Sequence, residues 1–452
     1  GPILARYRGC QLELTARMRA KDVPEPSKPW EGVRLAINYR TSTGAFSQSA
    51  NGNWGSFDRR AVTMLLRIPA DLTDASLDIG LLAPAGLVGV EGVTLTVTGL
   101  PLSSLVPPAQ PAHTGRIVPR LRGFNTGYRS PANLDAQRGI AALGGDWQAN
   151  VFKLWFLARK DLAATDRELV TWLDEVEAAL AVAHNARMLA VLHVGAWEWH
   201  VSAHGGNDRC YEDPVYADKL VEIYRTIAER YRGDRRIWAI ELLNESVQRL
   251  PPAEGCQDYE GLMERCALAI NQADPERTII VQPEEWWGVR AFEKLRPIRA
   301  SNLVYAAHIY SPFPVSHQGI PEVQGGKTSW TAHAYPGTID GIRWDRDTLR
   351  RELQPVRDFQ RAHGVHIVVS EFGCVRWAPG DSRQRLLSDM IDLFEEYGWD
   401  WIYHAYGDWM GWDITLGGDP RNSARPSAPT PAEELLRSWF AQNQRPFGGA
   451  AP

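Results

Sequence analysis

Eight short apolar stretches alternate with amphipathic stretches in the larger, C-terminal part of this 452-residue chain. The apolar stretches are rich in Ile, Val and Leu, which predicts buried parallel strands, and runs such as DRELVTWLDEVEAALAVAHNA between them predict helices. Eight strands in strict alternation with helices predict an α/β fold, the (β/α)8 TIM barrel, which needs ~250 residues or more. The predicted strands are 120–125, 150–156, 188–194, 237–243, 277–282, 302–308, 365–370 and 399–404.

The N-terminal part has a different pattern. Short stretches of alternating polar and apolar residues, such as QLELTARMRA and VTLTVTG, are separated by Pro, Gly and Asn. This spacing of strands and turns, without a helical period, predicts a β-sandwich. We therefore expect a β-sandwich at residues 1–104, a stiff proline-rich linker at 105–114 and the barrel at 115–452.

Two of the predicted barrel strands lead to a glutamate. Glu245 follows the run IWAIELLN, and Glu371 follows VHIVVS. Because catalytic groups of a barrel sit at the C-terminal ends of its strands, these carboxylates can face each other across one cleft. Glycoside hydrolysis needs such a pair, one group to protonate the leaving oxygen and one to attack the anomeric carbon or activate water. Taken singly, each glutamate can equally be a solvated cap of the next helix.

The sequence around these glutamates resembles that of a known family. Asn244 stands directly before Glu245, Glu371 ends the seventh predicted strand, and the segment at 306–319 is AAHIYSPFPVSHQG. Over about residues 115–445 the chain resembles glycoside hydrolase family 5 of clan A, the retaining, cellulase-like β-glycanases. The resemblance implies double displacement with Glu371 as nucleophile and Glu245 as acid/base, without metal or organic cofactor. For this role Glu245 must hold a proton, which an apolar pocket or the charge of Glu371 favours.

The same resemblance implies roles for four more residues. Asn244 would donate its amide to the sugar 2-hydroxyl, and His308 would lie near the acid/base. Tyr310 would hold Glu371 in the attacking orientation. His193, at the end of the third predicted strand, would face the substrate.

Two positions depart from the family pattern. Lys153 stands where the family usually has an arginine beside the nucleophile, and lysine keeps the charge without the two-pronged geometry. An ordinary barrel-interior lysine is the alternative. His404 stands where the family commonly has the tryptophan platform under the sugar. Trp409 or Trp412, slightly further along the chain, can supply that platform instead.

Tryptophans also follow the third and fifth predicted strands. Trp197, Trp286 and Trp287 lie in loops that should form cleft walls, where indole rings can stack on sugar rings. Simple packing is the alternative for each.

The N-terminal region resembles the jelly-roll modules that are joined to many glycosidases. Trp30, Trp54 and Phe57 are its candidate sugar-facing aromatics. A module that only braces the barrel is the alternative.

Charge and cysteine content bound the partners and the location of the protein. A net charge of −5, with both signs spread along the chain, argues against a nucleic-acid or membrane partner, and no 18-residue apolar run exists. Cys210 and Cys256 fall in loops on the same predicted barrel face, so they are either a disulfide or two thiols. A disulfide would indicate export. We expect a secreted or periplasmic enzyme, although no signal peptide is recognisable.

The sequence thus predicts an endo-β-1,4-glucanase that acts on β-glucan or a related polysaccharide or oligosaccharide. An exo-acting β-glucosidase, a β-mannanase or another β-glycan hydrolase on the same scaffold remains open. A non-catalytic carbohydrate-binding protein is the alternative from another class.

Overall fold

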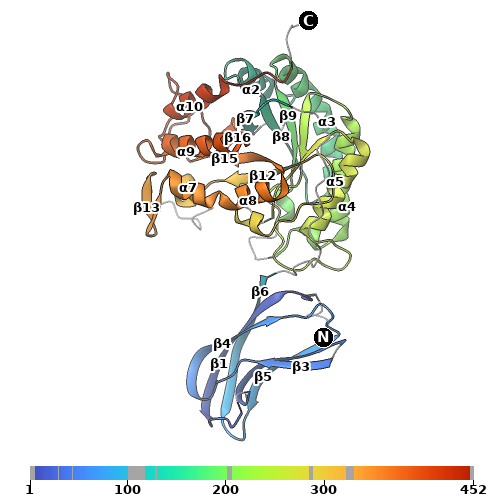
Figure 1. The fold of residues 1–452 in the computed structure, drawn as a ribbon, viewed down its shortest axis with the longest axis vertical. Helices are drawn as coiled ribbons and strands as arrows, with labels where there is room; N and C mark the ends of the chain where they lie inside the picture. Colours follow the sequence, from blue (N-terminus) through green and yellow to red (C-terminus); the bar gives the residue numbers. More distant parts are fainter. Residues whose placement is uncertain are drawn as a thin grey trace. The chain divides into compact units, whose positions relative to one another are not determined.

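The protein consists of two compact units, each described by itself (Figure 1). One comprises residues 1–106 with 202–207 and 248–258, and the other the rest of the chain. The predicted linker at 105–114 lies outside the described residues, and the predicted domain boundaries stay predictions. The computed structural model describes residues 6–28, 30–42, 44–99, 118–127, 130–200, 206–284, 289–321 and 330–447.

Eight parallel strands form a closed barrel in the second unit, in the order β10-β11-β12-β15-β16-β7-β8-β9. The barrel expected from the sequence is confirmed, and each observed strand overlaps its predicted range. The strands are β7 (Arg122–Thr126), β8 (Val151–Leu157), β9 (Leu189–Gly195), β10 (Ile237–Glu241), β11 (Thr278–Val281), β12 (Leu303–Ile309), β15 (His366–Phe372) and β16 (Asp400–Tyr406).

Helices lie around the outside of this ring of strands (Figure 1). Their ends follow local sequence signals. Asp161 accepts hydrogen bonds from two backbone amides at the start of α3, while α8 and α9 end at Gly364 and Gly398 in the left-handed conformation. The helices are α2 (Leu134–Gly145), α3 (Leu162–Asn185), α4 (Pro214–Arg230), α5 (Tyr259–Ala273), α6 (Phe313–Ser316), α7 (Arg346–Glu352), α8 (Gln354–His363), α9 (Ser382–Tyr397) and α10 (Pro431–Phe440).

The inside of the barrel changes character along its strands. On β12, Val304 and Ala306 belong to an apolar cluster inside the barrel, and the next alternate positions are His308 and, just after the strand, Tyr310. On β8, Val151 belongs to the same cluster, and Lys153 follows two residues later. Because alternate side chains of a strand point inward, the apolar layers end where the polar ones begin, at the C-terminal ends.

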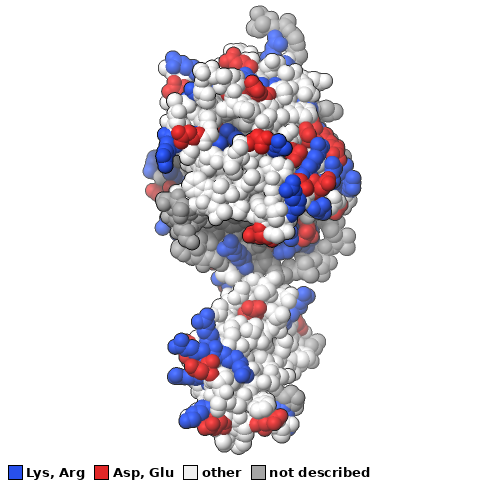
Figure 2. Space-filling model, turned by 90° about the vertical axis from the view of Figure 1, so that its left-hand side faces the viewer, with Lys and Arg blue, Asp and Glu red and all other residues white. Residues whose placement is uncertain are grey.

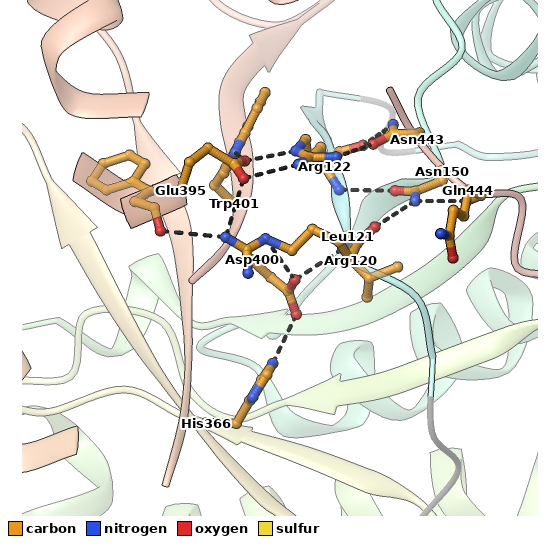
Figure 3. A network of polar contacts seen from close by, with 11 residues as sticks. Arg120, Leu121, Arg122, Asn150, His366, Glu395, Asp400, Trp401, Asn443 and Gln444 are labelled. Carbon is orange, nitrogen blue, oxygen red and sulfur yellow. Dashed lines mark hydrogen bonds and ion pairs between the residues drawn. The ribbon is translucent and has the colours of Figure 1, made fainter. Parts of the chain in front are cut away.

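The opposite, N-terminal ends of three neighbouring strands carry a polar network (Figure 3). Arg122 on β7 donates two hydrogen bonds to the Glu395 carboxylate, at 2.6 and 2.8 Å, and Trp401 Nε1 donates to the same carboxylate at 2.8 Å. Asp400 accepts from the backbone amide of Leu121 at 2.9 Å, and its other oxygen lies 3.1 Å from His366 Nε2. These contacts link the starts of β7, β15 and β16.

The first unit contains two antiparallel three-stranded sheets, with strand orders β4-β1-β6 and β3-β2-β5. Alternate residues of both sheets, such as Leu14 on β1 and Leu35 on β2, share one apolar core. The sequence did not predict β3, because GAFSQS shows no apolar alternation and five of its residues are exposed. The strands are β1 (Gln11–Val23), β2 (Gly32–Thr41), β3 (Gly44–Ser49), β4 (Gly55–Arg67), β5 (Asp74–Leu82) and β6 (Leu87–Gly99).

The three candidate aromatics of the first unit differ in exposure. Trp30 and Trp54 are 49% and 42% exposed, whereas Phe57 is half-buried with the Arg60 guanidinium 4.0 Å from its ring centre. Trp30 and Trp54 can therefore meet a ligand more readily than Phe57.

Basic and acidic side chains are interspersed over the barrel surface drawn in Figure 2. Ion pairs on the surface of this unit include Arg350 with Glu396, and Arg346 with Asp392 at 3.0 Å. Within the described part of the chain, no helix has the length and apolar character that crossing a bilayer requires.

Candidate active site

The segment after β10 brings Glu245 to the mouth of the barrel with an unusual backbone. Glu245 has a φ of 45°, in the left-handed region that non-glycine residues rarely adopt. Its amide donates to Gln282 Oε1 at 3.1 Å, and Gln282 Nε2 donates to Glu241 Oε1 at 2.8 Å. Such conformations cost on the order of 1–3 kcal/mol and cluster at functional sites. Gln282, which follows β11, thus holds Glu245 in a strained position.

Glu371, near the end of β15, is held from three sides. The Tyr310 hydroxyl donates to Oε2 at 3.0 Å, Asn125 Nδ2 donates to Oε1 at 3.3 Å, and Lys153 Nζ lies 3.5 Å from Oε1. Burial raises the pKa of Glu371, but the charges of His308 and Lys153 outweigh it and lower the pKa to about 2. Burial and the Glu371 charge raise the pKa of Tyr310 well above its usual value, so the phenol keeps the proton that it donates.

The two glutamates face each other, with His308 between them. One oxygen of Glu245, one of Glu371 and a ring nitrogen of His308 all lie within 4.8 Å of one another. His308 Nδ1 is 2.8 Å from Glu245 Oε1 and 3.7 Å from Glu371 Oε2. Burial lowers the pKa of His308, but the two carboxylates outweigh it and raise the pKa above the usual value. His308 is therefore placed to hydrogen-bond to Glu245 through Nδ1.

These three side chains are also a group whose donor atoms are close enough to hold a metal ion. Their donor atoms already contact one another, since His308 Nδ1 and Glu245 Oε1 are at hydrogen-bonding distance, 2.8 Å. The expectation that the protein needs no cofactor stays an expectation.

Asn244 is oriented by a buried histidine. His193 Nε2 lies 3.2 Å from Asn244 Oδ1, and His193 Nδ1 lies 3.2 Å from Glu241 Oε2. Asn244 Nδ2 is buried and has no hydrogen-bond partner among the described residues. A buried donor without a partner is costly in a folded protein, and a sugar hydroxyl in the cleft can accept from it.

Glu241 and Lys153 form a fully buried ion pair beneath the cleft. Their charged atoms are 3.1 Å apart, and Lys153 thereby links Glu241 to Glu371. Burial raises the pKa of Glu241, but the charges of Lys153 and His193 lower it well below the usual value. Glu241 was missed in the sequence, since it stands inside the apolar run IWAIELL.

A cleft of about 300 Å³ opens above these groups. Trp197 and Trp409, both predicted to face the substrate, line it and are 45% and 37% exposed. Trp286 and Trp287 lie outside the described residues. The lining residues are Gly127, Trp155, Leu157, Trp197, Glu245, Tyr310, His317, Glu371, His404, Asp408, Trp409 and Trp412.

His404 lines the cleft beside Glu371, and Trp412 packs against its ring at 5.4 Å and 80°. The Trp412 ring also lies 5.7 Å from Tyr310, and both Trp409 and Trp412 line the cleft. The position that the resemblance gives to a tryptophan platform is thus a polar side chain with tryptophans beside it.

The structure brings together nearly all of the described residues that the sequence pointed to. Glu245, Glu371, Tyr310, His404, Trp197 and Trp409 line the cleft, whereas Asn244, His193, His308 and Lys153 contact the glutamates or one another from below. Asn125 and Asp408 were missed, although Asn125 is a polar residue at a strand end and the rule applied to Glu371 would have found it.

Cys210 is buried and Cys256 half-buried in the structure. Whether they form a disulfide or are two thiols stays a prediction, and so does the argument for export that rests on it.

A family model and several known proteins match part of this chain. The family model described as cellulase (glycosyl hydrolase family 5) matches residues 112–409. Endoglucanase C of Acetivibrio thermocellus is 28% identical over 214 residues, covering 41% of this chain and 59% of that relative. The chain thus matches less than two thirds of that relative's length.

Solved structures share the barrel. Thermotoga maritima Cel5A in complex with mannotriose is 20% identical, with a TM-score of 0.55 over 70% of this chain and 97% of that one. A mutant form of the same protein in complex with cellobiose is 21% identical, with a TM-score of 0.54 over 70% and 96%. At these identities the likeness shows the fold alone.

Proposed function

The chain belongs to glycosyl hydrolase family 5, and from this membership we propose that it is a retaining endo-β-1,4-glucanase. The observation that carries the proposal is the facing pair Glu245 and Glu371, which have oxygens within 4.8 Å of each other. Retaining enzymes hold their carboxyl groups about 5–5.5 Å apart, whereas inverting enzymes need about 6.5–9.5 Å to admit a water. The spacing supports double displacement.

Glu371 is the nucleophile in this proposal. Its lowered pKa keeps it ionised, and Tyr310 and Asn125 fix its two oxygens. One carboxylate oxygen bonds to the anomeric carbon while the glycosidic oxygen departs. The product of this step is a covalent glycosyl-enzyme and a shortened glucan.

Glu245 is the acid/base. It gives a proton to the departing oxygen, so the leaving sugar is a neutral alcohol, while His308 Nδ1 lies 2.8 Å from its Oε1. Glu245 then takes a proton from the water that attacks the anomeric carbon. Glu371 is released and the β-configuration is restored.

Asn244 binds the 2-hydroxyl of the attacked sugar. His193 lies 3.2 Å from its oxygen, and its buried Nδ2 has no hydrogen-bond partner among the described residues and so can donate to the sugar. A hydrogen bond at this position strengthens as positive charge develops on the ring, and so it lowers the barrier as well as tightening binding. Lys153 places a positive charge beside the nucleophile, with its Nζ 3.5 Å from Glu371 Oε1.

The test combines a substrate panel with stereochemistry. We expect hydrolysis of soluble β-1,4-glucan to exceed that of mannan and xylan, with rapid loss of viscosity as internal bonds break. NMR of freshly released sugar should show the β-anomer first. An α-configured first product means inversion, and the role of Glu371 as nucleophile would then be abandoned.

The finer organisation is part of the same proposal. Residues 1–104 are a jelly-roll, carbohydrate-binding-module-like domain, 105–114 a linker and 115–452 the catalytic domain of a secreted or periplasmic enzyme. The exposure of Trp30 and Trp54 supports sugar binding by the first unit. The full chain should sediment with insoluble cellulose, and the double variant Trp30→Ala/Trp54→Ala should sediment less while keeping its activity on soluble glucan. Equal sedimentation of both would indicate a bracing role.

A further inference from the structure

Asn125, at the end of β7, has every group of its side-chain amide engaged. Trp155 Nε1 donates to Asn125 Oδ1 at 2.5 Å. An indole nitrogen can only donate, so the oxygen of the amide must face Trp155. The amide nitrogen then faces the other way, 3.3 Å from Glu371 Oε1 and 2.9 Å from His404 Nδ1.

This orientation fixes where His404 carries its proton. The amide nitrogen of Asn125 can only donate, so His404 Nδ1 accepts and bears no hydrogen. The ring proton of His404 is therefore on Nε2. Nε2 is 3.6 Å from Asp408 Oδ2, beyond hydrogen-bonding distance.

Both His404 and Asp408 line the cleft, and the Asp408 side chain is 34% exposed. The loop that carries Asp408 comes close to the end of β7 at Gly127. A Cβ atom at Gly127 would lie 2.7 Å from Asp408 Cα, so only glycine admits the loop there. The backbone thus places an acceptor, Asp408, beside the donor of His404.

We propose that His404 and Asp408 together bind one hydroxyl of the sugar that is attacked. The hydroxyl oxygen accepts from His404 Nε2 and its hydrogen is donated to the Asp408 carboxylate. This inference rests on the proposed function, and it makes the two residues determinants of specificity.

The position of the pair identifies the sugar and narrows the hydroxyl. His404 Nδ1 is 3.8 Å from Glu371 Oε2, so the pair lies beside the attacked carbon. In the order of strands, β16 lies opposite β10, which leads to Asn244. Since Asn244 is assigned to the 2-hydroxyl and the 4-oxygen of this ring is linked to the next sugar, the free hydroxyls left for this pair are the 3- and the 6-hydroxyl.

The test compares aryl β-cellobiosides that lack the 2-, 3- or 6-hydroxyl on the attacked ring with the parent compound. For the wild-type enzyme, loss of the 3- or the 6-hydroxyl should lower kcat/KM about 10- to 100-fold. For Asp408→Ala the same deletion should cost less than about threefold, because its partner is already absent. The 2-deoxy compound should lose equally with both enzymes.

Asp408→Asn, which is nearly isosteric, gives the same comparison should Asp408→Ala fold poorly, and its loss should be intermediate. Equal losses for all three deoxy compounds in wild type and variants would overturn the pair as a hydroxyl site while leaving the proposed function standing. A wild-type enzyme that cleaves neither the parent compound nor cello-oligosaccharides would overturn the proposed function itself, and this site with it.

Discussion

The two ends of the barrel differ in how completely their polar side chains pair with one another. At the N-terminal ends of β7, β15 and β16, the polar groups in Figure 3 are engaged with one another. Glu395 accepts from Arg122, Arg120 and Trp401, and burial, which raises its pKa, is outweighed by these donors, so its pKa is lowered. Arg120 Nε is the member of that network without a hydrogen-bond partner among the described residues.

At the C-terminal end of the barrel the polar side chains are incompletely paired. Within the described ranges, Asn244 Nδ2 after β10 and His308 Nε2 on β12 are buried without a hydrogen-bond partner. Glu245 also holds a strained backbone there.

The difference separates stability from function. Buried charges that attract and hydrogen-bond to one another offset the cost of removing them from water, and so they support the folded state. A buried donor without a partner beside a cleft makes a favourable hydrogen bond only when a ligand accepts from it. We therefore expect substitutions at one end to change unfolding and substitutions at the other to change turnover.

The largest effect is expected at the cleft end. Glu371→Gln removes the nucleophile and should lower kcat on the order of 10⁴-fold or more, while the variant still unfolds cooperatively. Turnover of β-glucan and thermal unfolding of the same preparation measure both quantities. Turnover within tenfold of the wild type would move the nucleophile to another residue.

The next effect is expected at the opposite end. Glu395→Gln leaves the Arg122 guanidinium, which is 9% exposed, without its charged partner and should lower the free energy of unfolding by about 3 kcal/mol. Its kcat should stay within twofold of wild type, because the activation free energy of the reaction is roughly unchanged. Asp381→Asn is the matched control, since its pair with Arg385 is exposed and worth less than about 1 kcal/mol. A large loss of kcat in Glu395→Gln would show that the two ends are coupled.

Sequence predicted the frame of this comparison well. Apolar runs between amphipathic runs gave all eight strands, because burial on both faces leaves a strong signal in composition. The rule that functional groups sit at strand ends then led to Glu245 and Glu371.

What sequence could not predict depends on contacts across the barrel. Glu241 looks like an interruption of an apolar strand until Lys153 is seen 3.1 Å away. The orientation of His404 follows from Asn125, which comes from a distant strand, and Asp408 reaches the cleft only because Gly127 admits its loop. The short strand β3 pairs with β2 through its backbone, so its composition carried no signal.

A smaller effect should come from Tyr310. Tyr310→Phe removes the donor to Glu371 at 3.0 Å and should lower kcat/KM roughly 10- to 100-fold, the usual range for a hydrogen bond to a charged group. Tyr224→Phe is its control, because the buried Tyr224 hydroxyl has no hydrogen-bond partner within the described part of the chain. That control should keep full activity. If both substitutions lower kcat/KM alike, the phenol of Tyr310 does not act through Glu371.

The smallest effect is a change in the free energy of unfolding at acid pH that comes from Glu371 at the cleft end. The pKa of Glu371 is lowered from 4.5 to about 2 in the folded protein, so its contribution to stability is present above pH 4.5 and is lost as pH falls toward 2. Over one pH unit in that window the loss is at most about 1.4 kcal/mol. Denaturant unfolding of wild type and Glu371→Gln between pH 5 and pH 3 measures it, since the other carboxylates contribute alike to both proteins. The wild type should lose stability relative to the variant as pH falls.

His308, whose pKa is raised, is protonated in both the folded and unfolded states below pH 4.5, so it does not change how stability varies with pH in this range. If the free energy of unfolding varies with pH in the same way for both proteins, the positive charges around Glu371 do not hold it ionised. The cleft end would then not owe its charged nucleophile to those neighbours, and this contrast with the network at the N-terminal end would fail.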